Sequence, residues 1–96
     1  MNMKEFLNHT AKIMPDVLSQ NVSGETVLLD LKGENYFGLD EVGTRIWQLL
    51  QEDGNLQSVL EKMLEEYNVT EDQIGMDIEQ LITNLNEAGL IEIIKE

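Results

Sequence analysis

The sequence predicts a small α+β domain in which a three-stranded antiparallel sheet is followed by three helices. Three observations predict this class. The chain has 96 residues, of which 42% are hydrophobic and 26% charged, so it can build one modest core. Before residue 40, short apolar stretches alternate with turn residues, as is typical of strands. After residue 40, apolar residues recur every three to four positions, as is typical of amphipathic helices.

Three short strands are expected, at about 17–22, 25–32 and 34–39. Ser23-Gly24 can form the first turn, and Gly33 can form the second because glycine adopts positive φ without steric cost. The apolar face of the second strand is expected to consist of Val27, Leu29 and Leu31. Tight turns place consecutive strands side by side, so the sheet is expected to be an antiparallel meander.

Three amphipathic helices are expected after the strands, at about 41–53, 56–67 and 71–88. Their N-caps are expected to be Asp40, Asn55 and Thr70, of which Thr70 forms a capping box with Gln73. Gly89 suits the left-handed position that ends a helix, and residues 91–94 are expected to form a short extended tail. Because each element has one apolar face, the helices are expected to pack on one face of the sheet, which makes 1–96 a single domain.

The composition is strongly acidic, with 19 Asp and Glu against 6 Lys and Arg, a net charge of −13. Residues 49–96 contain 12 of the acids and 2 of the bases, a net charge of −10. Nucleic acid and anionic membrane surfaces are therefore poor partners, whereas a basic or neutral peptide or protein suits the chain. The same charge also serves solubility alone. The absence of cysteine excludes a disulfide framework and fits a cytoplasmic location.

No catalytic residue, metal site or cofactor is predicted, and the chain is expected not to be an enzyme. His9, the single histidine, lies in a polar N-terminal segment where solvent exposure is expected. The serines lack a neighbouring base that could activate them. Adjacent acids such as Glu65 and Glu66 point about 100° apart on a helix, so such pairs do not chelate a metal together.

Three helices beside a small sheet also allow a winged-helix regulator that binds DNA through its third helix. Residues 70–88 contain no Lys or Arg and five acids. DNA affinity comes largely from cationic contacts with phosphates, so this alternative is disfavoured.

The third predicted strand is expected to lie at an edge of the sheet. Its residues include no Lys or Pro to block pairing, and Gly38 permits close backbone approach. An extended peptide can add to such an edge as a further strand. In one alternative, Tyr36, Phe37 and Leu39 belong to the core and a chain terminus covers the edge. In another, the edge serves homodimerisation, and the chain is an assembly or dimerisation subunit.

Residues 24–50 resemble the PqqD-like family, whose members are RiPP recognition elements that bind leader peptides of ribosomally made, modified peptides. The run 36–47 carries the resemblance with Tyr-Phe-Gly-Leu, the acidic residues Asp40 and Glu41, Val-Gly and Arg-Ile-Trp. It is similar to the discrete leader-binding proteins of lasso-peptide clusters, and a looser likeness extends over about 12–91. The chain departs from proteins of the pyrroloquinoline quinone pathway, which tend to carry Pro-Glu-Gly before the third strand and Leu-Asn after it.

The resemblance implies a winged-helix-like domain that acts as a non-catalytic adaptor. Such an adaptor captures a precursor's leader by strand addition and delivers it to a modifying enzyme, such as a protease, cyclase or radical enzyme. The leader is implied to pair with the third strand and to lie in a cleft against the third helix. The implied peptide-binding residues on the strand side are Glu34, Asn35, Tyr36, Phe37 and Gly38. Those on the helix side are Ile74, Asp77, Ile78 and Leu81. Val42 and Ile46 are expected in the core, and Asp40 as a helix cap.

Overall fold

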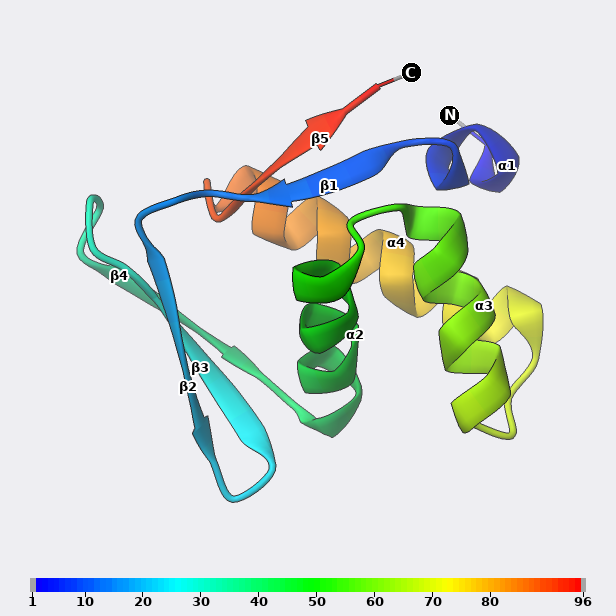
Figure 1. Ribbon diagram of the computed structural model, residues 1–96, viewed down its shortest axis with the longest axis horizontal. Helices are drawn as coiled ribbons and strands as arrows, with labels where there is room; N and C mark the ends of the chain where they lie inside the picture. Colours follow the sequence, from blue (N-terminus) through cyan, green and yellow to red (C-terminus); the bar gives the residue numbers. More distant parts are fainter. Residues whose placement is uncertain (1, 96) are drawn as a thin grey trace.

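The computed structural model describes residues 2–95 and has an α+β fold (Figure 1). Its elements are α1 (Met3–Leu7), β1 (Thr10–Ile13), β2 (Val17–Val22), β3 (Glu25–Asp30), β4 (Asn35–Leu39), α2 (Glu41–Glu52), α3 (Leu56–Glu66), α4 (Glu71–Glu87) and β5 (Ile91–Ile94). In Figure 1 the β2-β3-β4 sheet stands beside α2, while β1 and β5 run together along the helical part of the molecule.

The β2-β3-β4 sheet is the predicted antiparallel meander. Ser23 and Gly24 both have positive φ, 55° and 86°, as a two-residue turn with the twist of a hairpin requires. β3 ends at Asp30, two residues before the predicted end of that strand, and β4 begins one residue after its predicted start.

The second turn does not use the backbone freedom of Gly33, contrary to expectation. The residue with positive φ is Glu34, at 59°. A Cβ at position 33 would lie 2.6 Å from Oδ2 of Asp30, so a side chain there would require the Asp30 carboxylate to move. Asp30 closes the turn by accepting a hydrogen bond from the Lys32 backbone N–H at 3.2 Å. Glycine at position 33 therefore leaves room for the Asp30 side chain that closes the turn.

The face of β3 that packs inward is opposite to the predicted apolar face. Leu28 is fully buried and Thr26 is 5% exposed, whereas Leu29 is 37% exposed and Leu31, in the following turn, is 58% exposed. The register explains the inversion. Leu28 pairs with Phe37, and Thr26 pairs with the buried Leu39, which leads directly into α2. Since paired residues share a face, the entry into α2 decides which side of β3 is buried.

The outer face of this sheet consequently carries exposed apolar residues. Leu18 pairs with Leu29, and Leu29 pairs with Tyr36, so these three residues form one row across the strands. Leu18 is 52% exposed and Tyr36 is 79% exposed. The helices cover the opposite face, where α2 contacts β3 and β4.

Each of the three long helices begins at its predicted cap. Asp40 accepts from Gly43 N–H at 2.7 Å, Asn55 from Ser58 N–H at 2.9 Å, and Thr70 from Gln73 N–H at 3.1 Å. Only half of the predicted capping box forms, because the Gln73 side chain donates forward to Asp77. At the end of α4, Gly89 has φ of 78°, and the Leu90 N–H returns to the Leu85 carbonyl at 3.0 Å.

A second, two-stranded sheet is absent from the sequence-based prediction. The predicted tail 91–94 is strand β5, which pairs antiparallel with β1 from Thr10↔Ile94 to Ile13↔Ile91. On its other side, β1 is held by a hydrogen bond from Ala11 N–H to the Gly54 carbonyl at 2.9 Å. The two ends of the chain are thus joined over the helices (Figure 1).

The N-terminal segment forms a short helix that was not among the predicted elements. Asn2 caps the short helix α1 by accepting from Glu5 N–H at 2.8 Å, and this helix buries Phe6 and Leu7. His9 is only 8% exposed and packs edge-on against Phe6, so the expectation of a solvent-exposed histidine is wrong. The segment is held in place by burial of its apolar residues against the helices.

Candidate functional site

One edge of β4 pairs with no other strand in residues 2–95, because the sheet order is β2-β3-β4. The side chains of β4 alternate about this edge. Phe37 is half-buried against the core, whereas Tyr36 projects from the outer face. A Cβ at Gly38 would meet no heavy atom within 4 Å, so the strand is open at this position. This edge offers backbone donors and acceptors to an added strand.

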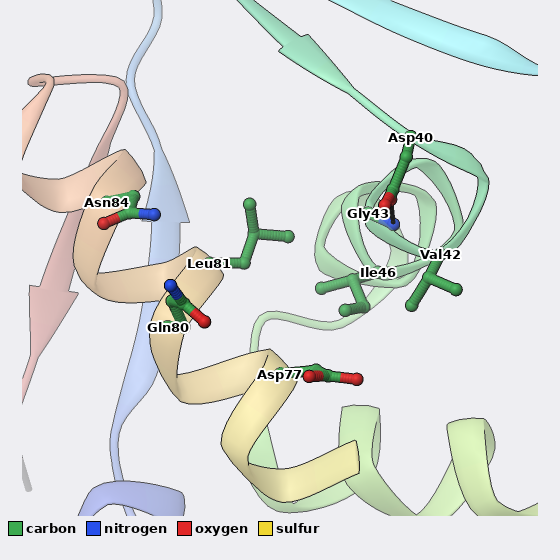
Figure 2. Close-up of a pocket in the computed structure, with 8 residues that line it drawn as sticks. All are labelled: Asp40, Val42, Gly43, Ile46, Asp77, Gln80, Leu81 and Asn84. Atoms are coloured by element: carbon green, nitrogen blue, oxygen red, sulfur yellow. Dashed lines mark hydrogen bonds between the residues drawn. The ribbon is translucent and has the colours of Figure 1, made fainter. Parts of the chain in front are cut away.

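A pocket of about 290 Å³ begins at the residue that follows β4. It lies between the first turns of α2 and the middle of α4, and Figure 2 shows its eight lining residues. The α2 side consists of Asp40, Val42, Gly43 and Ile46. The α4 side consists of Asp77, Gln80, Leu81 and Asn84. The pocket lining thus begins at Asp40, one residue after β4 ends at Leu39.

The pocket combines an apolar wall with a polar rim. In Figure 2, Leu81 projects from α4 toward α2, and Ile46 lies on the side of α2 nearer to it; Val42, from the first turn of α2, also lines the pocket. Both charged lining residues are carboxylates. Asp40 accepts the capping hydrogen bond from Gly43 through Oδ1 at 2.7 Å, and Asp77 accepts from Gln73 Nε2 through Oδ1 at 3.1 Å.

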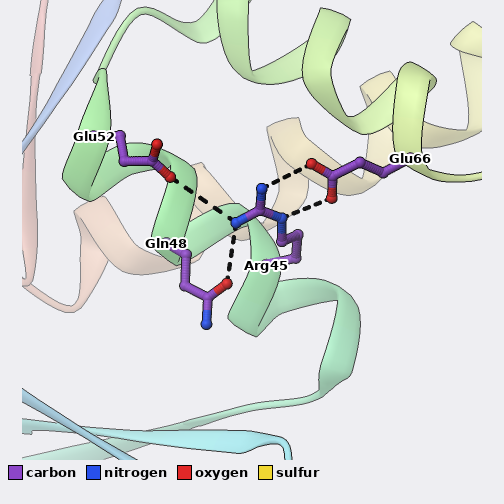
Figure 3. Close-up of polar contacts among 4 residues, drawn as sticks. All are labelled: Arg45, Gln48, Glu52 and Glu66. Atoms are coloured by element: carbon purple, nitrogen blue, oxygen red, sulfur yellow. Dashed lines mark hydrogen bonds and ion pairs between the residues drawn. The ribbon is translucent and has the colours of Figure 1, made fainter.

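The cation of α2 is held away from this pocket by acidic partners on another side of the helix (Figure 3). Arg45 donates through Nε and Nη2 to the two carboxylate oxygens of Glu66, at 2.7 Å each. It also donates through Nη1 to Gln48 at 3.1 Å and lies 4.0 Å from Glu52. These hydrogen bonds hold the pKa of Glu66 below its ordinary value and raise the pKa of Arg45. The carboxylates of the pocket thus have no cationic partner on α2.

The structure places the residues implied by the resemblance in three environments. Asp77 and Leu81 line the pocket, and Phe37 packs against the core from β4. Glu34, Asn35, Tyr36 and Gly38 are exposed along the turn and the strand. Ile74 and Ile78 are 2% and 0% exposed, so they support α4 from the core and do not contribute to the pocket wall.

Sequence reasoning missed Gln80 and Asn84 as lining residues. They lie three and seven positions after Asp77, which is the spacing of one helix face, so periodicity counted from Asp77 would have found them. Val42 and Ile46 were expected in the core, yet each also contributes to the pocket wall. Asp40 is both the cap of α2 and a lining residue, because the pocket opens at the start of that helix.

The described part of the chain holds no group of three or more His, Asp or Glu placed to bind a metal ion. Likewise, none of the helices within residues 2–95 is long and apolar enough to span a bilayer. The site combines the open edge of β4 with a small pocket that begins one residue after it, an arrangement that suits the binding of an extended chain.

Comparisons with known proteins agree with this geometry. Residues 25–91 match the family described as coenzyme PQQ synthesis protein D (PqqD). Among solved structures, the chain is similar to "TbiB1 in Complex with the TbiA(beta) Leader Peptide". The two share 36% identity and a TM-score of 0.80 over 84% of this chain and 94% of that one. It is also similar to "Lasso peptide synthetase B1 complexed with the leader peptide", with 25% identity and a TM-score of 0.77 over 86% and 98%. The comparison with curated proteins finds no match.

Proposed function

Because the chain belongs to the PqqD family, we propose that it is a non-catalytic adaptor that binds the leader segment of a ribosomally made precursor peptide. The observation that carries this proposal is the unpaired edge of β4, together with the pocket between α2 and α4 that begins at the next residue, Asp40. The two similar structures, each described as a complex with a leader peptide, support it. Since the precursor is made on ribosomes, we place this binding in the cytoplasm.

Binding occurs by strand addition. The leader, extended along β4, exchanges backbone hydrogen bonds with the free edge, and each is worth about 1 kcal/mol net. Side chains on one side of the leader face the inward side of β4, next to Phe37, and those on the other side face the surface that carries Tyr36. The backbone bonds supply affinity, and the pocket supplies specificity.

The adaptor then delivers the precursor to a modifying enzyme, such as a protease, a cyclase or a radical enzyme, which carries out the chemistry. Holding the leader beside that enzyme makes the encounter with the core peptide intramolecular. The local substrate concentration rises accordingly, to about the millimolar range for a short linker. A module without catalytic residues thereby accelerates the modification of a dilute precursor.

The first test is a fluorescence-polarisation titration of this protein with the labelled leader of the precursor encoded beside its gene. We expect saturable binding in the micromolar range or tighter, and no binding of a scrambled leader of the same composition. Absence of binding by every short peptide encoded nearby contradicts the proposal.

A second test addresses strand addition itself. N-methylation of single leader residues removes one backbone donor at a time and leaves the side chains unchanged. Because only alternate residues of an added strand donate to the edge, we expect losses of affinity with a period of two residues. Uniform tolerance of N-methylation along the bound segment contradicts strand addition.

The same open edge also supports a second candidate, a subunit that pairs with another copy of this chain. The exposed row of Leu18, Leu29 and Tyr36 on the outer sheet face favours self-association. Light scattering across a concentration series, with and without leader, separates the two functions. A dimer that the leader dissociates shows that both partners use the edge of β4.

A further inference from the structure

We propose that the pocket between α2 and α4 takes a lysine or arginine side chain of the bound peptide. The inference rests on the proposed function and assigns a chemical class to one contact within it. Pockets for small molecules and cofactors are about 300–1,000 Å³. At about 290 Å³, this pocket lies just below that range and suits one long side chain.

The apolar wall matches the stem of such a side chain. Val42 and Ile46 on α2 and Leu81 on α4 are half-buried or buried, and they form the apolar surface between the two helices (Figure 2). Lysine and arginine place their methylene chains on surfaces of this kind and keep the charged end among polar groups.

The polar rim matches the charged end. Asp40 and Asp77 accept their hydrogen bonds from the protein through Oδ1, which leaves Oδ2 of each carboxylate to a ligand. Gln80 and Asn84 add amide groups to the same rim. A cationic donor pairs with these acceptors, and hydrogen bonds to ionised groups are about twice as strong as neutral ones.

The surrounding charges favour a cation and disfavour a neutral occupant. Both charged lining residues are acidic, and α4 contains no Lys or Arg. Arg45 is bound to Glu66 and does not line the pocket. The positive N-terminal end of α2, equivalent to about half a charge, is offset by Asp40 and Glu41. A wholly apolar anchor would remove water from two carboxylates without supplying a partner, which is costly.

The test is a double-mutant cycle between protein and peptide. In the labelled leader, each Lys or Arg is replaced singly by Gln. In the protein, Asp77→Asn and Asp40→Asn remove the charges of the pocket, and Asp40→Asn retains a side-chain oxygen able to cap α2. Asp72→Asn removes the same charge from an exposed position of α4 outside the pocket and serves as the matched control. Circular dichroism confirms that each variant is folded.

We expect one Lys→Gln or Arg→Gln leader to bind about ten-fold more weakly, and Asp77→Asn to weaken the parent leader by a similar factor. The two changes together should cost no more than either one, because they remove the same contact. Asp72→Asn should change the affinity less than about two-fold.

The outcomes separate this inference from the proposed function. If the parent leader has no Lys or Arg and still binds saturably, the cationic contact is overturned and the adaptor function stands. The same holds if the leader binds but none of its Lys or Arg residues is energetically coupled to Asp77 or Asp40. Equal losses of leader affinity for Asp77→Asn and Asp72→Asn show that the net charge of the protein, and not a contact in the pocket, affects binding. This result also overturns the cationic contact. No binding of the leader by the parent protein overturns both proposals.

Discussion

Arg45 and Glu66 face each other across α2 and α3 with two parallel hydrogen bonds, Nε to Oε1 and Nη2 to Oε2, both 2.7 Å long (Figure 3). The pair joins the first half of α2 to the end of α3, 21 residues along the chain. It keeps the guanidinium on the side of α2 away from the residues that line the pocket. The same pair makes part of the stability depend on pH.

Replacement of Glu66 by Gln should lower the free energy of unfolding at pH 7 by at most about 1 kcal/mol, since both side chains are about one-third exposed. The pKa of Glu66 is lowered in the folded protein from an ordinary value of 4.5, mainly by the hydrogen bonds from Arg45. The stability that the pair contributes is therefore fully present above about pH 4.5. It is lost as the pH falls through the lower pKa that Glu66 has in the folded protein.

Urea unfolding of the parent and the Glu66→Gln variant at several pH values between 7 and 3 measures this difference. The gap between the two proteins should narrow as the pH falls. Glu65→Gln, an exposed neighbour with the same change in net charge, is the control. The pairing is contradicted if Glu66→Gln and Glu65→Gln lower the free energy of unfolding by the same amount relative to the parent. It is also contradicted if the difference between the parent and Glu66→Gln widens in acid.

Two adjacent leucines of β3 test the orientation of the sheet. Leu28 is fully buried and Leu29 is 37% exposed. Leu28→Ala should lower the free energy of unfolding by about 2–5 kcal/mol through loss of buried surface and creation of a cavity. Leu29→Ala should cost about 0.5 kcal/mol or less. Chemical denaturation measures both, and the reverse order would place the predicted apolar face inward after all.

Gly54 and Gly38 differ in the space available for a methyl group. A Cβ at Gly54 would clash with the Ala11 carbonyl oxygen in the backbone of β1, whereas a Cβ at Gly38 meets nothing within 4 Å. Gly54→Ala should displace β1 and lower the free energy of unfolding by about 1–3 kcal/mol. Gly38→Ala should be neutral or slightly stabilising. Thermal unfolding of both variants compares the same chemical change at the two sites, and equal stability would contradict the close approach of β1 to residue 54.

The cap of α2 gives a prediction that separates charge from hydrogen bonding. Asp40→Ala removes the acceptor for Gly43 N–H and should cost about 1 kcal/mol, whereas Asp40→Asn retains an acceptor and should cost much less. Helix content by circular dichroism and the unfolding midpoint in urea measure both effects. Similar losses for the two variants would show that the carboxylate acts there mainly through its charge.

Much of the meander and the helical part of the molecule could be predicted because their signals are local. The turn at Ser23-Gly24 and the caps at Asp40, Asn55 and Thr70 involve residues no more than four apart in the sequence. The apolar stripes of the helices likewise follow from period alone. Asp77 and Leu81 of the pocket were implied by the family resemblance and not by periodicity, which does not separate them from the buried Ile74 and Ile78.

The β1–β5 sheet escaped prediction because neither strand is defined without the other. Each has four residues, and their partners lie about 80 positions apart in the chain. Four residues carry too little periodicity to distinguish a strand from an extended tail. The burial of α1 also depends on partners distant in the chain, because this helix packs against α3 and α4.

By itself, the sequence determined the elements whose information lies within one turn or one face: the hairpin turn, the helix caps and stripes, and the acidic charge of α4. Tertiary structure alone decided which face of β3 is buried, because alternation defines two faces and only the passage from Leu39 into α2 selects between them. It also decided that α2 and α4 share a pocket near the end of β4. The lining residues of the two helices are more than 30 positions apart in the sequence and meet only when the helices pack.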